Sequence, residues 1–169
     1  KKGYLIITRP LFVESLTPLI KSRSSEGFDV SIVTVEEIES SVDGKDIPEK
    51  IRNYLRDEYQ TNDLGWVLLV GDVDPDDFIT DYTEDYLLDK AWEVPIRYFG
   101  LPDPEFELKK DWIPTDQYYA TLNNELNPSQ NEFSFEANVY VGRFPVRTPE
   151  ELNNLVEKTV RWKPEHEVS

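Results

Sequence analysis

Short apolar runs alternate with helical segments, and this alternation is the strongest constraint on what the chain can fold into. Apolar residues dominate Tyr4–Ile7, Val30–Val35, Trp66–Val70 and Asn138–Val141. Runs of this length are typical of parallel strands that are buried on both faces. Strands that alternate with helices predict a parallel sheet with right-handed crossovers and with helices on both sides.

We therefore expect one α/β domain over residues 1–169, built as three layers around a doubly wound, mainly parallel sheet of four strands. The predicted strand order is 2-1-3-4, because the last crossover must return beyond the third strand. Ile6, Val33, Leu68 and Val139 should lie near the centre of this sheet.

Two helices carry strong start signals. Asp46 stands three residues before Glu49, and Thr148 stands three residues before Glu151. This spacing is typical of an N-cap whose side chain binds the first turn of a helix. Pro149 strengthens the second signal because proline suits the first helical position.

The start of the first helix is ambiguous. It should follow Pro10 and stop at Gly27. Pro18, however, is tolerated only within a first turn, because proline removes a backbone donor from a helix interior. Either this helix begins near Thr17 or it is kinked.

The alternation fails over the long stretch between Val70 and Asn138. A stretch of this length without regular alternation is usually a functional or interaction element. We expect a short strand within Trp92–Phe99 and a hairpin arm within Thr115–Leu122, followed by turn residues at 123–124.

Composition excludes several classes of partner. The formal net charge of −16 argues against nucleic acid and anionic lipid, which are bound mainly through Lys and Arg. No apolar run is long enough to span a membrane. With 7 glycines and no glycine-rich strand-to-helix turn, we expect no nucleotide site. A phospho-acceptor receiver domain is disfavoured because Thr8-Arg9-Pro10 stands where that fold needs an acidic pair.

An acidic stretch begins just past the third strand, where open parallel sheets place their ligand crevice. Its first carboxylates are those of Asp72, Asp74, Asp76 and Asp77. Oxygen-rich clusters suit Ca²⁺ or Mg²⁺, so these four residues are the candidate metal ligands, with Ca²⁺ as the candidate cofactor. The alternative is a solvated acidic loop, because the spacing lacks the glycine and the final glutamate of an EF-hand loop.

The chain cannot assemble a familiar nucleophilic site. It contains no cysteine, and its single histidine is His166, which follows Lys163-Pro164. We interpret His166 as a residue without a catalytic role. The isolated chain should therefore be inactive as a peptidase, and disulfides and thiolate metal sites are excluded.

Three motifs occur in order along the chain. They are Val70-Gly71-Asp72, Thr115-Asp116-Gln117-Tyr118-Tyr119, and Gly142-Arg143-Phe144 ahead of Glu151-Leu152. Together they resemble the amino-terminal subdomain of gingipain-type (C25) cysteine peptidases, over nearly the whole chain.

That resemblance implies a peptidase built from two side-by-side α/β subdomains related to the caspase fold. The catalytic Cys and His belong to the second subdomain, so this chain would be the non-catalytic first one. Its partners would be the catalytic subdomain of the same parent chain and, through it, a polypeptide substrate. The resemblance also implies calcium binding, without placing ligands, and an extracellular or cell-surface location. The alternative is a stand-alone cation-binding or protein-interaction module with the same fold.

Two glycines and one charged pair are the remaining candidates at the carboxyl edge of the sheet. Gly71 and Gly142 should permit a positive φ or a close approach of backbone. Arg143 and Asp116 should form a partly buried pair, with a solvated Arg143 as the alternative. We interpret both chain ends as boundaries within a longer protein.

Overall fold

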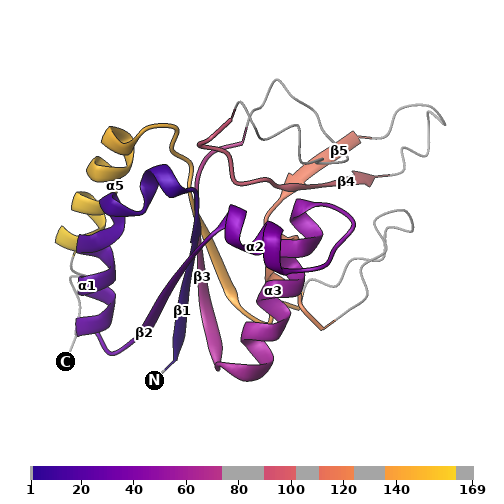
Figure 1. Cartoon of the computed structure of the whole chain (residues 1–169), viewed down its shortest axis with the longest axis horizontal. Coiled ribbons are helices and arrows are strands. Elements are labelled where there is room, and N and C mark those ends of the chain that lie inside the picture. The colour runs from indigo at the N-terminus through magenta and orange to yellow at the C-terminus, as the bar shows by residue number, and fades with distance from the viewer. Residues whose placement is uncertain (1, 74–89, 102–110, 124–135, 163–169) are drawn as a thin grey trace.

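A four-stranded parallel sheet forms the centre of the molecule, with the strands in the order β2-β1-β3-β6 (Figure 1). The computed structural model describes residues 2–73, 90–101, 111–123 and 136–162. The predicted doubly wound order is confirmed, with β6 as the predicted fourth strand. The sheet strands are β1 (Gly3–Thr8), β2 (Asp29–Thr34), β3 (Leu64–Val70) and β6 (Tyr140–Phe144).

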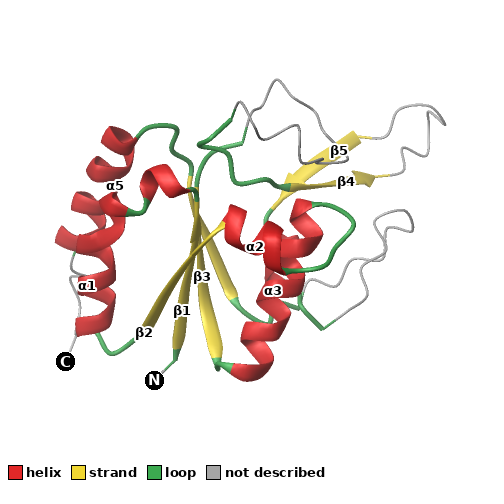
Figure 2. Ribbon diagram, viewed as in Figure 1, coloured by secondary structure: helices red, strands yellow, loops and turns green. Residues whose placement is uncertain are grey.

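Helices cover both faces of the sheet, as the alternating pattern predicts (Figure 2). One face carries α1 (Thr17–Ser25) and α5 (Pro149–Arg161), and we call it the α1/α5 face. The other carries α2 (Val35–Ser41) and α3 (Ile47–Thr61), and we call it the α2/α3 face. Successive residues of a strand point to opposite faces, so each strand contributes to both cores.

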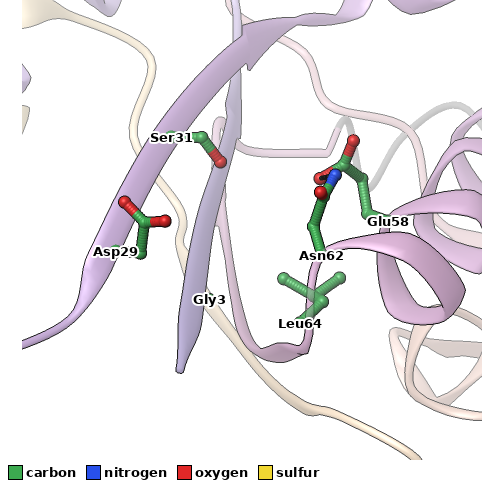
Figure 3. Close-up of a pocket in the computed structure, with 6 residues that line it drawn as sticks. All are labelled: Gly3, Asp29, Ser31, Glu58, Asn62 and Leu64. Atoms are coloured by element: carbon green, nitrogen blue, oxygen red, sulfur yellow. Dashed lines mark hydrogen bonds between the residues drawn. The ribbon is translucent and has the colours of Figure 1, made fainter. Parts of the chain in front are cut away.

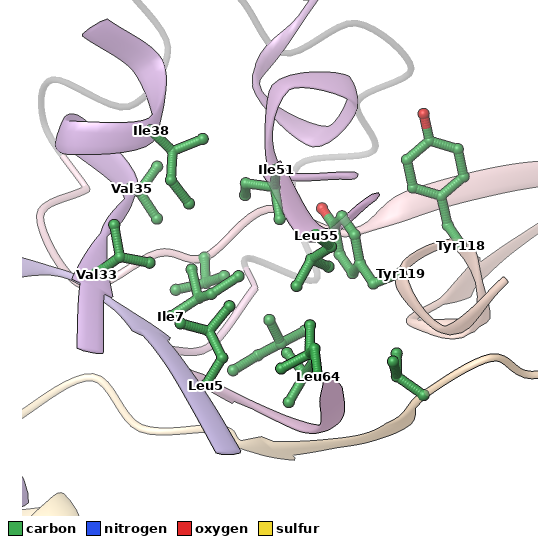
Figure 4. Packing of buried hydrophobic residues seen from close by; sticks show 14 of the residues in the cluster. Leu5, Ile7, Val33, Val35, Ile38, Ile51, Leu55, Leu64, Tyr118 and Tyr119 are labelled. Carbon is green, nitrogen blue, oxygen red and sulfur yellow. The ribbon is translucent and has the colours of Figure 1, made fainter. Parts of the chain in front are cut away.

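Each face has its own hydrophobic core. The core of the α2/α3 face is shown in Figure 4, where Ile38, Ile51 and Leu55 of the helices meet Leu5 and Ile7 of β1. On the α1/α5 face the buried residues include Ile6, Phe12, Leu16, Leu19, Leu68, Val70, Leu152 and Val156. The sheet is therefore packed against a hydrophobic core on each of its faces.

The helix starts follow local sequence signals. Two short 3₁₀ turns, Pro10–Phe12 and Glu14–Leu16, precede α1, which begins at Thr17 with Pro18 in its first turn. The first of the two alternatives for this helix is therefore correct. Gly27, with φ of +98°, follows the end of the helix.

Capping interactions account for the starts of α2, α3 and α5. Asp46 accepts from the Glu49 backbone N–H at 3.0 Å, and Thr148 and Glu151 form a reciprocal capping box. The sequence reasoning missed α2, although Thr34 and Glu37 form the same type of box at its start. The apolar residues that run to Val35 predict a longer second strand, and Thr34 and Glu37 lie at the end of that run.

Several boundaries in the long stretch were predicted wrongly. β4 (Arg97–Leu101) pairs with β5 (Asp111–Thr115) in an antiparallel hairpin. The predicted hairpin arm within Thr115–Leu122 is instead the short helix α4 (Gln117–Ala120), because Tyr118 and Tyr119 turn into the α2/α3 core.

The fourth strand also differs in position from the prediction. It begins at Tyr140 and runs to Phe144, so Val139 is buried but precedes it. Gly142, not Val139, lies opposite Leu68 in the sheet register. Within the described residues, no helix has the length and apolar character needed to cross a membrane.

Candidate functional site

Arg143 of β6 connects the end of β3 to the segments that contain Val94 and Asp116. Its Nε and Nη2 donate to the two carboxylate oxygens of Asp116 at 2.8 and 2.7 Å. Its Nη1 donates to the carbonyl oxygens of Gly71 and Val94, both at 2.8 Å. Only 11% of the Arg143 side chain and 24% of the Asp116 side chain are exposed. The predicted partly buried pair is confirmed, and the solvated alternative is not.

This arrangement makes Arg143 a hub for separate segments of the chain. A bidentate pair between guanidinium and carboxylate fixes orientation as well as distance. Because the same guanidinium also binds the backbone beside Gly71 and Val94, it ties the end of β3 to the segment that leads into β4. We call these contacts the Arg143 hub.

Gly71 is required at its position for two reasons. Its φ is +148°, a conformation that L side chains rarely adopt. A Cβ at this residue would also lie 2.5 Å from the Trp92 carbonyl oxygen and 2.7 Å from Val94 Cγ2. The prediction for Gly71 is confirmed. It is wrong for Gly142, which has no positive φ and is exposed.

Asp72 closes the same edge through a second arginine. Its Oδ2 accepts from Arg147 Nε at 2.7 Å, and the Arg147 guanidinium lies 4.5 Å from the centre of the Trp92 ring. The Asp72 backbone N–H donates to the Val146 carbonyl at 3.0 Å, while its own carbonyl accepts from Val94 N–H at 3.2 Å. Asp72 is thus part of the joint between β3, β6 and the segment before β4.

A second anchor holds β4 against α3. Arg97 donates to Asp46 Oδ2 at 2.8 Å and to Oδ1 at 2.6 Å, and Asp46 is the residue that caps α3. The guanidinium groups of Arg97 and Arg52 both lie over the Tyr118 ring, 4.8 and 5.0 Å from its centre. Arg52 also donates to the Thr121 carbonyl at 2.7 Å. The sequence reasoning missed this anchor, because Asp46 and Arg97 are far apart in the chain and the N-cap pattern at Asp46 does not indicate a partner at Arg97.

The surroundings of Arg97 and Tyr119 shift the pKa values of both side chains. Burial lowers the pKa of Arg97, but the hydrogen bonds and charge of Asp46 outweigh it and the pKa is raised above its usual range. Burial raises the pKa of Tyr119, whose hydroxyl donates to the Pro95 carbonyl at 2.8 Å. Arg97 therefore stays charged and Tyr119 stays neutral under all ordinary conditions.

Comparison with known proteins gives these contacts a context. The profile of peptidase family C25 matches residues 1–168. The chain belongs to peptidase family C25. This result confirms the resemblance to gingipain-type cysteine peptidases that the three motifs indicate.

Solved structures show the same fold within much longer chains. Dimeric latent PorU from Porphyromonas gingivalis has 21% identity and a TM-score of 0.61, covering 94% of this chain and 15% of that one. The complex of Porphyromonas gingivalis RgpB pro- and mature domains has 18% identity and a TM-score of 0.61, covering 98% and 30%. A structure described as a protease has 21% identity and a TM-score of 0.57, covering 94% and 27%. No curated protein matches significantly.

At these identities the likeness to solved structures shows the fold alone. The C25 chain spans between 15% and 30% of the length of the three chains named. Two of the three C25 motifs meet in the Arg143 hub, since Asp116 belongs to one and Arg143 to another. The third supplies Gly71, whose carbonyl accepts from the same arginine.

The described contacts at the carboxyl edge of this C25 chain are ion pairs and hydrogen bonds between arginine, aspartate and backbone carbonyls. The sequence has no cysteine, and His166 lies outside the described residues. In these contacts the N–H groups of the arginines donate to the aspartate carboxylates and to backbone carbonyls. The arrangement fixes the end of β3, β6 and the segment before β4 against one another.

The calcium prediction gains no support from the residues in view. Asp74, Asp76 and Asp77 lie outside the described residues, and Asp72 is already paired with a cationic partner, Arg147. Among the described residues, no three acidic or histidine side chains gather in a way that would hold a metal ion. Calcium binding by this stretch stays a prediction.

A pocket of about 370 Å³ opens at the other end of the sheet (Figure 3). Asn62 donates to Glu58 Oε2 at 3.0 Å within it. It lies at the amino ends of the strands, away from the edge where open parallel sheets bind ligands. Its lining consists of Gly3, Asp29, Ser31, Glu58, Asn62 and Leu64.

Proposed function

We propose that this chain is the non-catalytic, amino-terminal subdomain of a gingipain-like cysteine endopeptidase. In this role it scaffolds a second subdomain that carries the catalytic cysteine and histidine. One observation carries the proposal: the C25 profile spans residues 1–168, yet the chain contains no cysteine. Since a Cys-His peptidase needs a thiolate and a base to activate it, the chemistry must reside elsewhere in the parent protein.

The Arg143 hub supports the scaffolding role. Peptide hydrolysis requires the nucleophile, the base and the scissile bond to be held in a defined geometry. A displacement of about 1 Å therefore lowers the reaction rate. A subdomain that flanks such a site must itself be rigid. Arg143 provides that rigidity by fixing β3, β6 and the segment before β4 against one another.

The substrate and the location follow from the same proposal. A polypeptide would be bound mainly by the catalytic subdomain, with the loops at the carboxyl edge forming part of the rim. The parent peptidase would act outside the cell or at its surface. Calcium, if it binds near Asp72 to Asp77, would act on stability and not on the chemical step.

The test uses reporter peptides cleaved after Arg, Lys or Ala, in the presence of a reductant. The isolated chain should show no turnover above buffer. Addition of the remainder of the parent protein, produced as a separate polypeptide, should give turnover that a thiol-alkylating agent abolishes. Turnover by the isolated chain that survives repurification and alkylation would contradict the proposal. A parent sequence without a downstream Cys and His would favour the stand-alone module instead.

A further inference from the structure

Part of the sheet on the α1/α5 face is open to solvent. Tyr140, Gly142 and Phe144 of β6 lie opposite Trp66, Leu68 and Val70 of β3. Phe144 packs against the α1/α5 core, but Tyr140 is 70% exposed. Among the described residues, none comes within 4 Å of a Cβ built on Gly142. Parallel sheets are normally covered on both faces, so an open strip over β6 needs an explanation.

Aromatic rings line the strip and fix its shape. The ring of Tyr140 stacks on that of Trp66 with centroids 5.7 Å apart and an interplanar angle of 28°. Trp66 meets Phe28 at 4.9 Å, and Phe28 meets Tyr4 at 5.6 Å, both edge to face. Rings held by their neighbours offer contact area at little cost in conformational entropy, as binding hot spots do. We call the surface formed by Tyr140 and Gly142 of β6, together with Trp66 of the neighbouring strand β3, the β6 face.

We propose that the β6 face docks an apolar surface of the remainder of the parent peptidase chain. This inference rests on the proposed function, because it names the surface through which the scaffold holds its catalytic partner. An apolar side chain of that partner would stack beside Tyr140. The missing side chain at Gly142 leaves room for it to approach the sheet.

Chain length and charge favour this occupant over others. The solved chains with this fold are several times longer than this one, since it covers 15% to 30% of them, so further chain is available to cover the strip. A second copy is disfavoured because each copy carries a formal charge of −16 and the two would repel. The same charge argues against an anionic lipid surface.

The test replaces Gly142 with glutamine in this chain. Gly142 has no positive φ and has open space above it, so the substitution should leave the urea midpoint of the isolated chain unchanged. Its binding to the remainder of the parent chain, measured by calorimetry with that polypeptide in trans, should weaken at least tenfold. Tyr140→Ser should weaken binding similarly. Ser31→Gln, an exposed site on the other edge strand, is the matched control and should bind like the unmodified chain.

Three other outcomes would contradict the inference, and they differ in what they imply for the proposed function. If Gly142→Gln and the unmodified chain bind equally and restore turnover equally, the surface is wrong and the proposed function stands. If the unmodified chain neither binds nor restores turnover, the proposed function fails and this inference fails with it. If sedimentation shows a dimer of this chain that Gly142→Gln dissociates, a second copy is the true occupant and the inference is overturned.

Discussion

Replacing Arg143 with leucine should remove about 3 kcal/mol of folding stability. The substitution leaves the Asp116 carboxylate without its bidentate partner and removes a donor from the Gly71 and Val94 carbonyls. Breaking one member of a buried pair costs about 3–5 kcal/mol. The lower end applies because Asp116 keeps 24% exposure, so water can solvate part of the orphaned charge.

Urea denaturation followed by circular dichroism measures this loss. With a slope of about 2 kcal/mol per molar urea, the midpoint should fall by about 1.5 M. The control is Arg161→Leu, which breaks an exposed ion pair with Glu157 on α5, where the arginine is 78% exposed. Exposed pairs contribute little, so the control should change stability by less than about 0.5 kcal/mol.

A double-mutant cycle with Asp116→Leu separates the carboxylate from the carbonyls. The pair should show a coupling energy of at least about 1 kcal/mol, because the two side chains contact each other directly. Equal urea midpoints for Arg143→Leu and Arg161→Leu would refute the view that the hub holds the carboxyl edge together.

Three further predictions concern backbone, pH and metal. Gly71→Ala should destabilise the chain by at least about 2 kcal/mol in urea titration, against about 1 kcal/mol for Gly27→Ala, because only Gly71 combines a positive φ with a clash. The hydrogen bond from the Thr34 backbone N–H lowers the pKa of Glu37. The stability that the ionised Glu37 gives to the folded chain is therefore present at neutral pH. Melts of Glu37→Gln and the unmodified chain should therefore converge as the pH falls below about 4. Calcium should raise the melting temperature above that in sodium at matched ionic strength, by relieving repulsion among the carboxylates that begin at Asp72. Coincident melts would leave only the solvated loop.

Local signals explain what the sequence could predict. The strands and capped helices are encoded by residues within a few positions of one another, so apolar runs and boxes such as Thr148 with Glu151 were enough to obtain the sheet order. The α2 box at Thr34 and Glu37 is equally local and could have been found. The pair of Arg143 with Asp116 was predictable because both lie in C25 motifs.

Distant contacts explain what the sequence could not predict. Thr115–Leu122 contains residues that suit a strand, yet it includes the helix α4, in which Tyr118 packs against Arg97 and Arg52. Nothing near Tyr118 in sequence indicates that packing. The sequence also could not show that Gly142 has open space beside it. A glycine in a strand can mark either the close approach of another group or empty space.

The Arg143 hub has a consequence for the order of folding. It joins Arg143 to residues that lie 27, 49 and 72 positions away in the chain, so it requires three large loops to close first. We expect the hub to form late in folding, because the entropy of closing all three loops is lost before its hydrogen bonds can form. A late contact slows unfolding more than it speeds folding. The hub should therefore slow unfolding. Its loss should shorten the lifetime of the native state and leave the rate of folding almost unchanged.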